Sequence, residues 1–291
     1  MIVIKSRDEL VKLRRSNILV AQILAELKPA CVAGVTTYDL EQLALSRIDA
    51  AGARPAFKGY RGYPACLCTS INEEVVHGIP SRRRMLKQGD IISIDLGVLL
   101  EGFYGDSAVT IGIEPISPPA RLLLEATERA LYIGIEAARA GNRLTDISHQ
   151  IQLCAEAYGF SVVRDFVGHG IGTQLHEEPQ LPNYGDPGRG PRLMPGMVLA
   201  IEPMVNQGGP EVEVLPDHWT AVTCDRKLSA HFEHSVAITE SGPWVLSQLG
   251  AGAGRAESEQ EFGAGAAPPP VGRETLQAHA NAKSLWEWPK P

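Results

Sequence analysis

The sequence carries one pattern twice, at a spacing of 107 residues. In each copy a glycine precedes an apolar strand that ends in a carboxylate: Asp95 closes the segment 86–95, and Glu202 closes the segment 193–202. The same shift aligns 33–52 with 140–159, where alanine, glycine and aspartate positions recur. Because two separate segments share one offset, we predict a duplicated chain whose halves are related by a pseudo-two-fold axis.

Apolar periodicity and capping residues predict four helices and, most clearly, four strands. The helices are expected from Ser6 to Pro29, from Thr36 or Thr37 to near Gly52, from Pro118 to about Ala140, and from about Thr145 to Tyr158. The strands are expected over 91–98, 102–111, 197–205 and 231–239. Because the elements do not alternate strictly as β-α-β, the pattern favours an α+β fold over a doubly wound parallel sheet.

Charge and cysteine content exclude several classes of protein. The 291 residues carry a net charge of −7, which argues against a general binder of nucleic acid or membrane surfaces. The sequence contains no uninterrupted run of about 18 apolar residues, so no membrane span is predicted. The N-terminus also lacks the apolar core of a secretory signal. The five cysteines form no Cys-x-x-Cys pair, which indicates reduced thiols and a cytoplasmic protein.

The composition changes sharply near Gly250. Between Gly250 and Gly272, 15 of 23 residues are glycine, alanine or proline, a content too low in apolar side chains to form a core. We therefore predict a folded domain over 1–249 and a flexible linker with a tail over 250–291. Two tryptophans near the end of that tail are interpreted either as a docking peptide or as a segment lying loosely on its own domain.

Four carboxylates and one histidine lie beside apolar strand segments. They are Asp95, Asp106, Glu202, Glu233 and His169. Four carboxylates gathered in one place repel one another unless protons or cations intervene. One imidazole with four carboxylates is a hard ligand set, which suits two divalent ions such as Mn, Fe, Co or Zn. The glycines on either side of His169 indicate a close approach of backbone or ligand.

Four further histidines lie near these residues in the sequence. His77 and His176 are expected beside the same cleft, His176 following His169 by seven residues. His231 and His234 flank Glu233, and we expect both to point away from it and to serve a structural or supporting role.

Taken together, these motifs resemble the type I methionine aminopeptidases over about residues 3–249. The matching runs are 59–64, 70–73, 75–80, 89–95, 105–106, 168–172, 176–179, 195–197, 201–203 and 232–234. The resemblance implies the α+β pita-bread fold, a curved antiparallel sheet covered by helices in two related halves. It also implies removal of the N-terminal methionine from nascent proteins and peptides with a small uncharged second residue.

The resemblance further implies a role for each site residue. Asp95, Asp106, His169, Glu202 and Glu233 would hold two divalent ions, with Asp106 and Glu233 bridging them and a bridging hydroxide attacking the peptide carbonyl. Glu202 would also relay protons. His77 would hydrogen-bond near the scissile nitrogen, and His176 would polarise the substrate carbonyl. The residues expected to line the methionine pocket are Tyr60, Tyr63, Cys68 and Trp219.

Three positions depart from the pattern most familiar in bacterial members. Phe57 and Val76 stand where cysteine is frequent, and Leu175 stands where phenylalanine often precedes the second histidine. These exchanges leave the expected metal ligands intact and alter the pocket. Asn72 and Ser229 match positions that help hold a monovalent cation in some members.

Two alternatives share the fold. An aminopeptidase P or prolidase has the same five ligands, usually behind a long N-terminal domain, whereas here the catalytic unit would start almost at residue 1. A non-catalytic relative that binds nucleic acid or partners would tend to lose ligands and to carry a basic patch, of which only 82–84 gives a hint. We expect a monomer acting on peptides and nascent chains, with transient ribosome contact and no nucleic-acid specificity.

Overall fold

The computed structural model describes residues 1–250. All but the first residue of the predicted linker and tail, 250–291, lie outside the described residues. Four α-helices are present where four were predicted: α1 (Arg7–Ala30), α2 (Thr37–Ala50), α3 (Pro118–Ala137) and α4 (Leu144–Ala157). A short 3-10 turn, η1, covers Tyr60–Gly62. Helix α3 ends three residues earlier than expected because Ala138 leaves the helical region, with a ψ of 61°.

The predicted caps explain where the first two helices begin. Ser6 accepts a hydrogen bond from the Glu9 amide, and the Glu9 carboxylate accepts one from the Ser6 amide. Thr36 and Asp39 make the same reciprocal pair at the start of α2. Each pair satisfies two amide groups that the helix itself leaves without partners.

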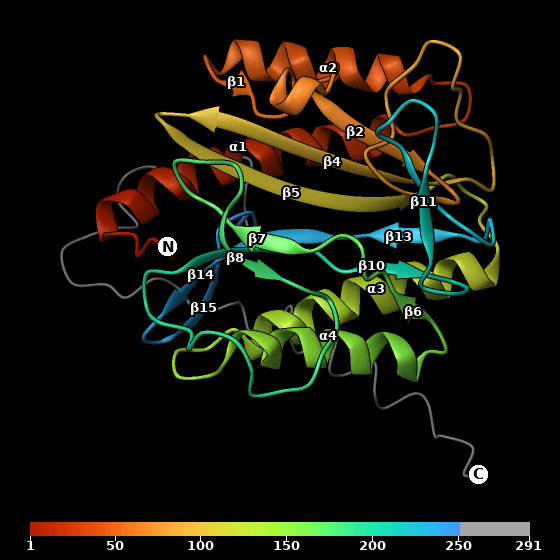
Figure 1. Ribbon diagram of the computed structural model, residues 1–291. Coiled ribbons are helices and arrows are strands. Elements are labelled where there is room, and N and C mark those ends of the chain that lie inside the picture. The colour runs from red at the N-terminus through yellow and green to blue at the C-terminus, as the bar shows by residue number, and fades with distance from the viewer. Residues whose placement is uncertain (251–291) are drawn as a thin grey trace, which may run out of the picture.

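A nine-stranded antiparallel sheet forms the centre of the molecule. Its main path runs β1 (Arg54–Pro55), β4 (Ile91–Leu100), β5 (Phe103–Gly112), β14 (Glu233–Thr239), β9 (Val198–Ile201), β7 (Gly168–Gly170) and β8 (Glu177–Leu181). β2 (Leu67–Ile71) also pairs with β4, and β15 (Gly242–Val245) pairs with β14. Figure 1 shows the long β4–β5 hairpin. Its turn at Glu101 and Gly102 has the positive φ angles that are typical of a two-residue hairpin turn.

Two three-stranded sheets flank the central one. The first has the order β13 (Ser229–His231), β10 (Met204–Asn206), β6 (Ser161–Val162). The second has the order β11 (Val212–Val214), β12 (Ala221–Thr223), β3 (Glu74–Val76).

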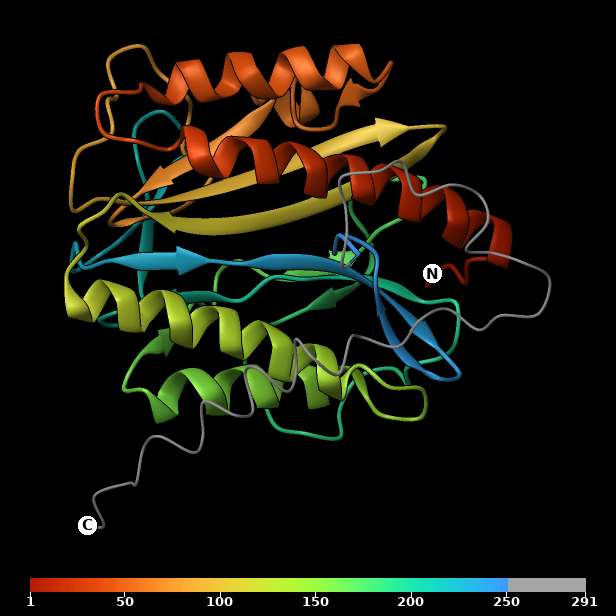
Figure 2. The same cartoon turned by 180° about the vertical axis from the view of Figure 1, so that it is seen from behind.

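The helices cover one face of the central sheet. Figure 2 shows α1 and α3 running across this face, with α2 beyond α1 and α4 beyond α3. Leu27, Ile48 and Ile94 belong to the core under the first helix pair, whereas Leu131, Ile151 and Leu199 belong to the core under the second. No helix among residues 1–250 combines the length and apolar character needed to cross a membrane.

The backbone confirms the predicted duplication. Helices α2 and α4 are displaced by 107 residues at both ends, and so are β1 and β6. The Gly34 amide donates to the Leu86 carbonyl, and the Gly141 amide donates to the Leu193 carbonyl, each over 2.9 Å. Two isolated bridges repeat the same shift, Thr36 with Met85 and Arg143 with Arg192. The related halves therefore share a hydrogen-bonded frame as well as a sequence pattern.

The strands predicted over 197–205 and 231–239 are each broken in two, which corrects the expectation of continuous strands. The breaks fall at Glu202–Pro203 and at Phe232, opposite each other in the paired strands. Pro203 has no amide hydrogen to donate, so the ladder cannot continue through it. The bend places Glu202 and Glu233 where the central sheet ends.

Candidate metal centre and substrate cavity

Three of the predicted carboxylates share one face of the central sheet. Asp95 on β4 and Glu233 on β14 both lie opposite Ala108, from the two sides of β5. Asp106 lies two residues before Ala108 on β5 itself. Because side chains alternate along a strand and directly opposed residues point the same way, the three carboxylates are on the same side. The hairpin thus brings Asp95 and Asp106 to neighbouring rungs of the same face.

His169 and Glu202 join them from the second half of the chain. His169 on β7 lies opposite Ala200, and Glu202 follows Ala200 by two residues. Ser235 also lies opposite Ala200 and follows Glu233 by two residues, so the same alternation places all five predicted ligands on one face. The His169 Nε2 is 3.5 Å from the Glu202 Oε1.

The residues at this face fit a divalent cation. Ligand atoms of Asp106, His169 and Glu233 all lie within 4.8 Å of one another. One oxygen on each of Asp95, Asp106 and Glu233 is buried without a hydrogen-bond partner. His169 donates from Nδ1 to the Gly170 carbonyl over 2.9 Å, which leaves the Nε2 lone pair free for a metal. Buried acceptors without donors are what a cation would satisfy.

The electrostatics of the cluster support the same conclusion. Burial raises the pKa of Asp95 to about 7. Burial, followed by repulsion from neighbouring carboxylates, raises the pKa of Asp106, Glu202 and Glu233 well above the usual range. Without cations, the predicted repulsion is therefore relieved by protons, which bound divalent ions would replace.

Two asparagines that the sequence analysis missed hold the backbone of this face. Asn17 on α1 is fully buried, and its Oδ1 accepts a hydrogen bond from the Asp106 amide over 3.2 Å. Asn183 donates from Nδ2 to the Glu202 carbonyl over 3.0 Å. For Asn17, the sequence did offer a signal, because it is a polar residue on the apolar side of a predicted helix. Gly105 completes the contact, because a Cβ there would lie 2.6 Å from the Ser16 carbonyl carbon.

The glycines beside His169 serve the backbone. A Cβ on Gly168 would collide with the Ala200 carbonyl, and one on Gly170 would collide with the Glu178 carbonyl. They allow β7 to pair closely with both neighbours.

A cavity of about 310 Å³ opens in front of the five predicted ligands. All four predicted pocket residues line it, as do both predicted histidines and the three departures from the bacterial pattern. They are Tyr60, Tyr63, Cys68, Trp219, His77, His176, Phe57, Val76 and Leu175. Tyr63 and Trp219 meet edge to face with ring centroids 5.0 Å apart, which gives the cavity an aromatic wall.

His77 and His176 stand at this wall as neutral imidazoles. Burial lowers the pKa of each to about 4. His77 adopts a φ of 61°, a left-handed conformation rare for histidine, and meets Phe166 edge to face at 5.4 Å. His176 lies 4.2 Å from His169 between ring centroids, and its Nδ1 is 2.8 Å from the Tyr60 hydroxyl. Phe166 was not identified from the sequence.

The orientation expected for the two histidines beside Glu233, pointing away from it, is right for His234 and wrong for His231. His231 is two residues from Glu233, a spacing that returns the side chain to the same side, and its Nε2 is 3.8 Å from the Glu202 Oε2. His234 points to the opposite face, where its ring nitrogens meet Ser247 at 2.8 Å and Tyr132 at 3.3 Å.

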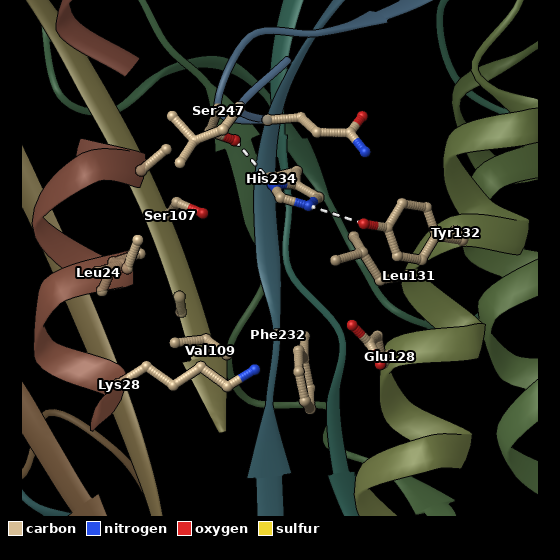
Figure 3. Close-up of a pocket in the computed structure, with 15 residues that line it drawn as sticks. Leu24, Lys28, Ser107, Val109, Glu128, Leu131, Tyr132, Phe232, His234 and Ser247 are labelled. Carbon is tan, nitrogen blue, oxygen red and sulfur yellow. Dashed lines mark hydrogen bonds between the residues drawn. The ribbon is translucent and has the colours of Figure 1, made fainter. Parts of the chain in front are cut away.

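Figure 3 shows His234 in a second, smaller pocket on the helix side of the sheet. This pocket of about 240 Å³ lies between α1 and α3, with Leu24 and Leu131 among its walls. Both ring nitrogens of His234 are already hydrogen-bonded to protein groups, so neither is free to bind a ligand in this pocket. His234 therefore supports the sheet behind Glu233.

Asn72 and Ser229, the positions predicted to hold a monovalent cation, meet directly. The Ser229 amide donates to the Asn72 carbonyl over 2.8 Å, and the Ser229 hydroxyl donates to the Asn206 Oδ1 over 2.8 Å. The cation itself stays a prediction.

Comparison with known proteins agrees with this geometry. The sequence matches metallopeptidase family M24 over residues 11–240. The chain is 52% identical over 247 residues to a methionine aminopeptidase of Clostridium acetobutylicum, an alignment that covers 85% of this chain and 99% of that one. It is also 52% identical over 249 residues to methionine aminopeptidase 1 of Bacillus subtilis, covering 86% and 100% of the two chains.

Solved structures show the same fold. The methionine aminopeptidase of Thermotoga maritima superposes with a TM-score of 0.83 at 46% identity, covering 86% of this chain and all of that one. A prolidase from Pyrococcus horikoshii shares the fold with a TM-score of 0.70 at 20% identity, and the match covers 64% of that chain.

The chain therefore belongs to metallopeptidase family M24, a family of enzymes that bind divalent metal. Within that family it is a member of the methionine aminopeptidases with the pita-bread fold, as the sequence motifs predicted. The runner-up, a prolidase or aminopeptidase P, shares the fold at much lower identity.

Proposed function

We propose that this enzyme removes the N-terminal methionine from peptides and nascent proteins, with a preference for a small uncharged second residue. The observation that carries the proposal is the position of the orphaned carboxylate oxygens beside an apolar, aromatic cavity. Peptide hydrolysis needs an activated water molecule, stabilisation of the developing negative charge and a proton for the leaving amine. Each need has a candidate group at this cavity.

The proposed metal ligands are Asp95, Asp106, His169, Glu202 and Glu233. Two divalent ions held by this set, whether Co, Mn, Fe or Zn, would lower the pKa of a water molecule and polarise the peptide carbonyl. The alternation that places all five side chains on one face supports the assignment.

Glu202 is the proposed proton carrier. Its carboxylate lies at the cavity, with Oε1 3.5 Å from the His169 Nε2, so it is placed to take a proton from the attacking water. It would pass that proton toward the leaving amine. The Nε2 of His231 lies 3.8 Å from the Glu202 Oε2 and has no hydrogen-bond partner. It therefore stands beside the proposed path of the proton.

His77 and His176 are proposed to bind the scissile peptide group. Burial lowers their pKa values, so at neutral pH each imidazole is uncharged and can donate from one ring nitrogen. His77 would hydrogen-bond near the scissile nitrogen. His176 would donate to the substrate carbonyl, and its short contact with the Tyr60 hydroxyl orients the ring.

The methionine side chain is proposed to enter between Tyr60, Tyr63, Cys68 and Trp219. Aromatic edges and a thiol suit a flexible, polarisable thioether. All five cysteines are free thiols, which agrees with our proposal that the enzyme works in the cytoplasm. There a monomer would act on nascent chains with transient ribosome contact.

A peptide assay with the full-length protein tests the proposal. We expect release of methionine from a Met-Ala-Ser peptide, loss of that activity after exhaustive chelation, and recovery with Co or Mn. An Xaa-Pro peptide offered in the same assay separates this activity from a prolidase or an aminopeptidase P. Turnover of the Met-Ala-Ser peptide that survives chelation, or by the Glu202→Ala variant at the wild-type rate, would show the proposal to be wrong.

A further inference from the structure

A buried ion pair ties the N-terminal segment, residues 2–5, to the loop that carries His176. The Lys5 ammonium contacts the Glu177 Oε2, and only 3% and 6% of the two side chains are exposed. Lys5 also donates to the Val3 carbonyl over 3.1 Å. The two residues lie 172 positions apart in the chain, so the contact exists only in the folded protein.

Two glycines make room for this arrangement. The Lys5 amide donates to the Gly196 carbonyl over 2.8 Å, and a Cβ on Gly196 would lie 2.7 Å from the Ile4 side chain. A Cβ on Gly172 would lie 2.6 Å from the Lys5 Cε and would also collide with the Glu177 carboxylate. The ion pair therefore rests directly on the backbone of the loop 172–177.

The same carboxylate organises that loop. The second oxygen of Glu177 accepts a hydrogen bond from the Gln174 amide over 3.3 Å, and the Gly172 amide donates to the Gln174 carbonyl over 3.1 Å. Glu177 is the next residue after His176. The imidazole of His176 is thus fixed from two directions, by its own backbone and by the Tyr60 hydroxyl.

Stability alone does not explain a buried ion pair. Apolar side chains of similar volume commonly stabilise a protein as much as such a pair or more, since both charges must leave water. Directional hydrogen bonds do define a position, and catalysis is sensitive to displacements of about 1 Å. The ion pair between Lys5 and Glu177 therefore serves mainly to fix the position of the loop, and contributes little to the stability of the fold.

We propose that Lys5 is a positioning residue for His176, acting through Glu177. This inference rests on the proposed function, in which His176 binds the substrate carbonyl. Lys5 lies N-terminal to residues 11–240, the part of the chain that matches the family.

The test is Lys5→Met in the full-length, metal-loaded enzyme. We expect kcat to fall by between about tenfold and a hundredfold, with KM changed by less than about twofold because the methionine pocket is untouched. Arg121→Met is the matched control, since it breaks an exposed ion pair of 3.0 Å with Glu114, and it should leave both constants unchanged. A wild-type kcat for Lys5→Met would overturn the inference.

A double-mutant cycle with His176→Ala separates positioning from general destabilisation. In the His176→Ala background, Lys5→Met should cause no further loss of kcat, whereas losses that multiply would refute the inference. If His176→Ala alone keeps full activity, the proposed role of His176 fails first. If only His176→Ala is impaired, the inference about Lys5 fails by itself.

A second pair of variants covers the case in which Lys5→Met does not fold. Lys5→Met with Glu177→Leu removes both charges, so we expect a melting temperature close to that of the wild type but the same reduced kcat. Lys5→Arg keeps the ion pair and should restore most of kcat. Recovery of kcat in the double variant would show that the pair serves stability only.

Discussion

The floor and the wall of the cavity are built in different ways. The floor consists of the proposed metal ligands Asp95, Asp106, His169, Glu202 and Glu233, which lie on or directly beside paired strands. The wall consists of other residues that line the cavity, namely Phe57, Tyr60, Tyr63, Cys68, Val76, His77, Leu175, His176 and Trp219. Except for Cys68 on β2 and Val76 at the end of β3, the wall residues stand on loops or on the short turn η1.

This difference predicts which residues of the cavity can be exchanged without abolishing the reaction and which cannot. The positions of the floor residues follow from strand register, and a one-residue slip would turn every ligand to the helix side. The wall depends on local backbone shape, such as the left-handed conformations of Arg61 and His77. The exchanges at Phe57, Val76 and Leu175 all fall on the cavity lining and leave the five ligands in place. We therefore expect variants of floor residues to abolish the reaction, and variants of wall residues to change its rate or its specificity to different degrees.

Asp106→Asn is the sharpest test of the floor. The amide has the size of the carboxylate but cannot bridge cations, so we expect kcat/KM for a Met-Ala-Ser peptide to fall by more than about a thousandfold. Metal content, measured by elemental analysis, should fall in parallel. The metal-free variant should melt at a higher temperature than metal-free wild type, because Asp106 repels Glu233 and Asp95.

The matched control for this variant is Asp186→Asn, which alters an exposed aspartate that does not line the cavity. It should change neither activity nor metal content. If Asp106→Asn kept its metal and its turnover, the floor would not be the metal centre.

His77→Ala tests the wall at the residue with the largest proposed catalytic role. We expect kcat/KM to fall by about a hundredfold to a thousandfold, while metal content stays at the wild-type level because the floor is intact. His218→Ala is a close control, since His218 is an exposed histidine with a similar φ of 66°. Loss of metal from His77→Ala would erase the distinction between floor and wall.

Local rules place part of the floor, namely Asp95, Asp106 and Glu202. Apolar strands ending in carboxylates, a tight turn at Gly102 and side-chain alternation together bring Asp95 and Asp106 to neighbouring rungs. The 107-residue repeat then relates Asp95 to Glu202. Each of these steps needs only the spacing of residues along the chain.

Contacts that depend on packing could not be predicted in this way. Asn17 reaches the Asp106 amide across 89 positions, and Lys5 reaches Glu177 across 172. No periodicity links such pairs, since their meeting depends on how α1 and the N-terminal segment lie against the sheet. The breaks at Pro203 and Phe232 were missed for a related reason, because an apolar run does not show where its strand bends.

Phe57→Cys tests whether the wall sets specificity. The ring rests directly on Gly97, where a Cβ would lie 2.7 Å from the Phe57 Cε1, and Gly97 pairs with Asp106. Removing the ring should deepen the pocket, so kcat/KM for peptides beginning with ethionine should rise about tenfold relative to methionine. Gly97→Ala should be tolerated in the Phe57→Cys background and should impair the wild type. Unchanged relative rates in Phe57→Cys would place the end of the pocket elsewhere.

The pH dependence of the metal-free protein gives the smallest predicted effect and joins the two regions. Asp95 on the floor has a pKa raised from 3.8 to about 7, and the pKa values of the other three carboxylates are also raised well above their usual range, chiefly by burial. A pKa raised by folding contributes stability that is present at low pH and is lost as the pH rises through the folded value. The floor should therefore destabilise the metal-free fold progressively as the pH rises from the ordinary carboxylate pKa of about 4 toward the raised folded values.

The wall has the opposite sign, over a window that ends near pH 6.5. Burial lowers the pKa of His77 and His176 from 6.5 to about 4, so these groups destabilise the fold only when the pH falls below 6.5. Above that pH they are neutral in both states, and the carboxylates act alone. Each proton that the folded carboxylates still hold there, and that the unfolded chain has released, lowers the free energy of unfolding by about 1.4 kcal/mol per pH unit. We expect the melting temperature of the chelated protein to fall between pH 7 and 8. The metal-loaded protein, whose carboxylates are already ionised, should show no such fall. Parallel melting curves for the two forms would mean that the floor does not hold protons in place of metal.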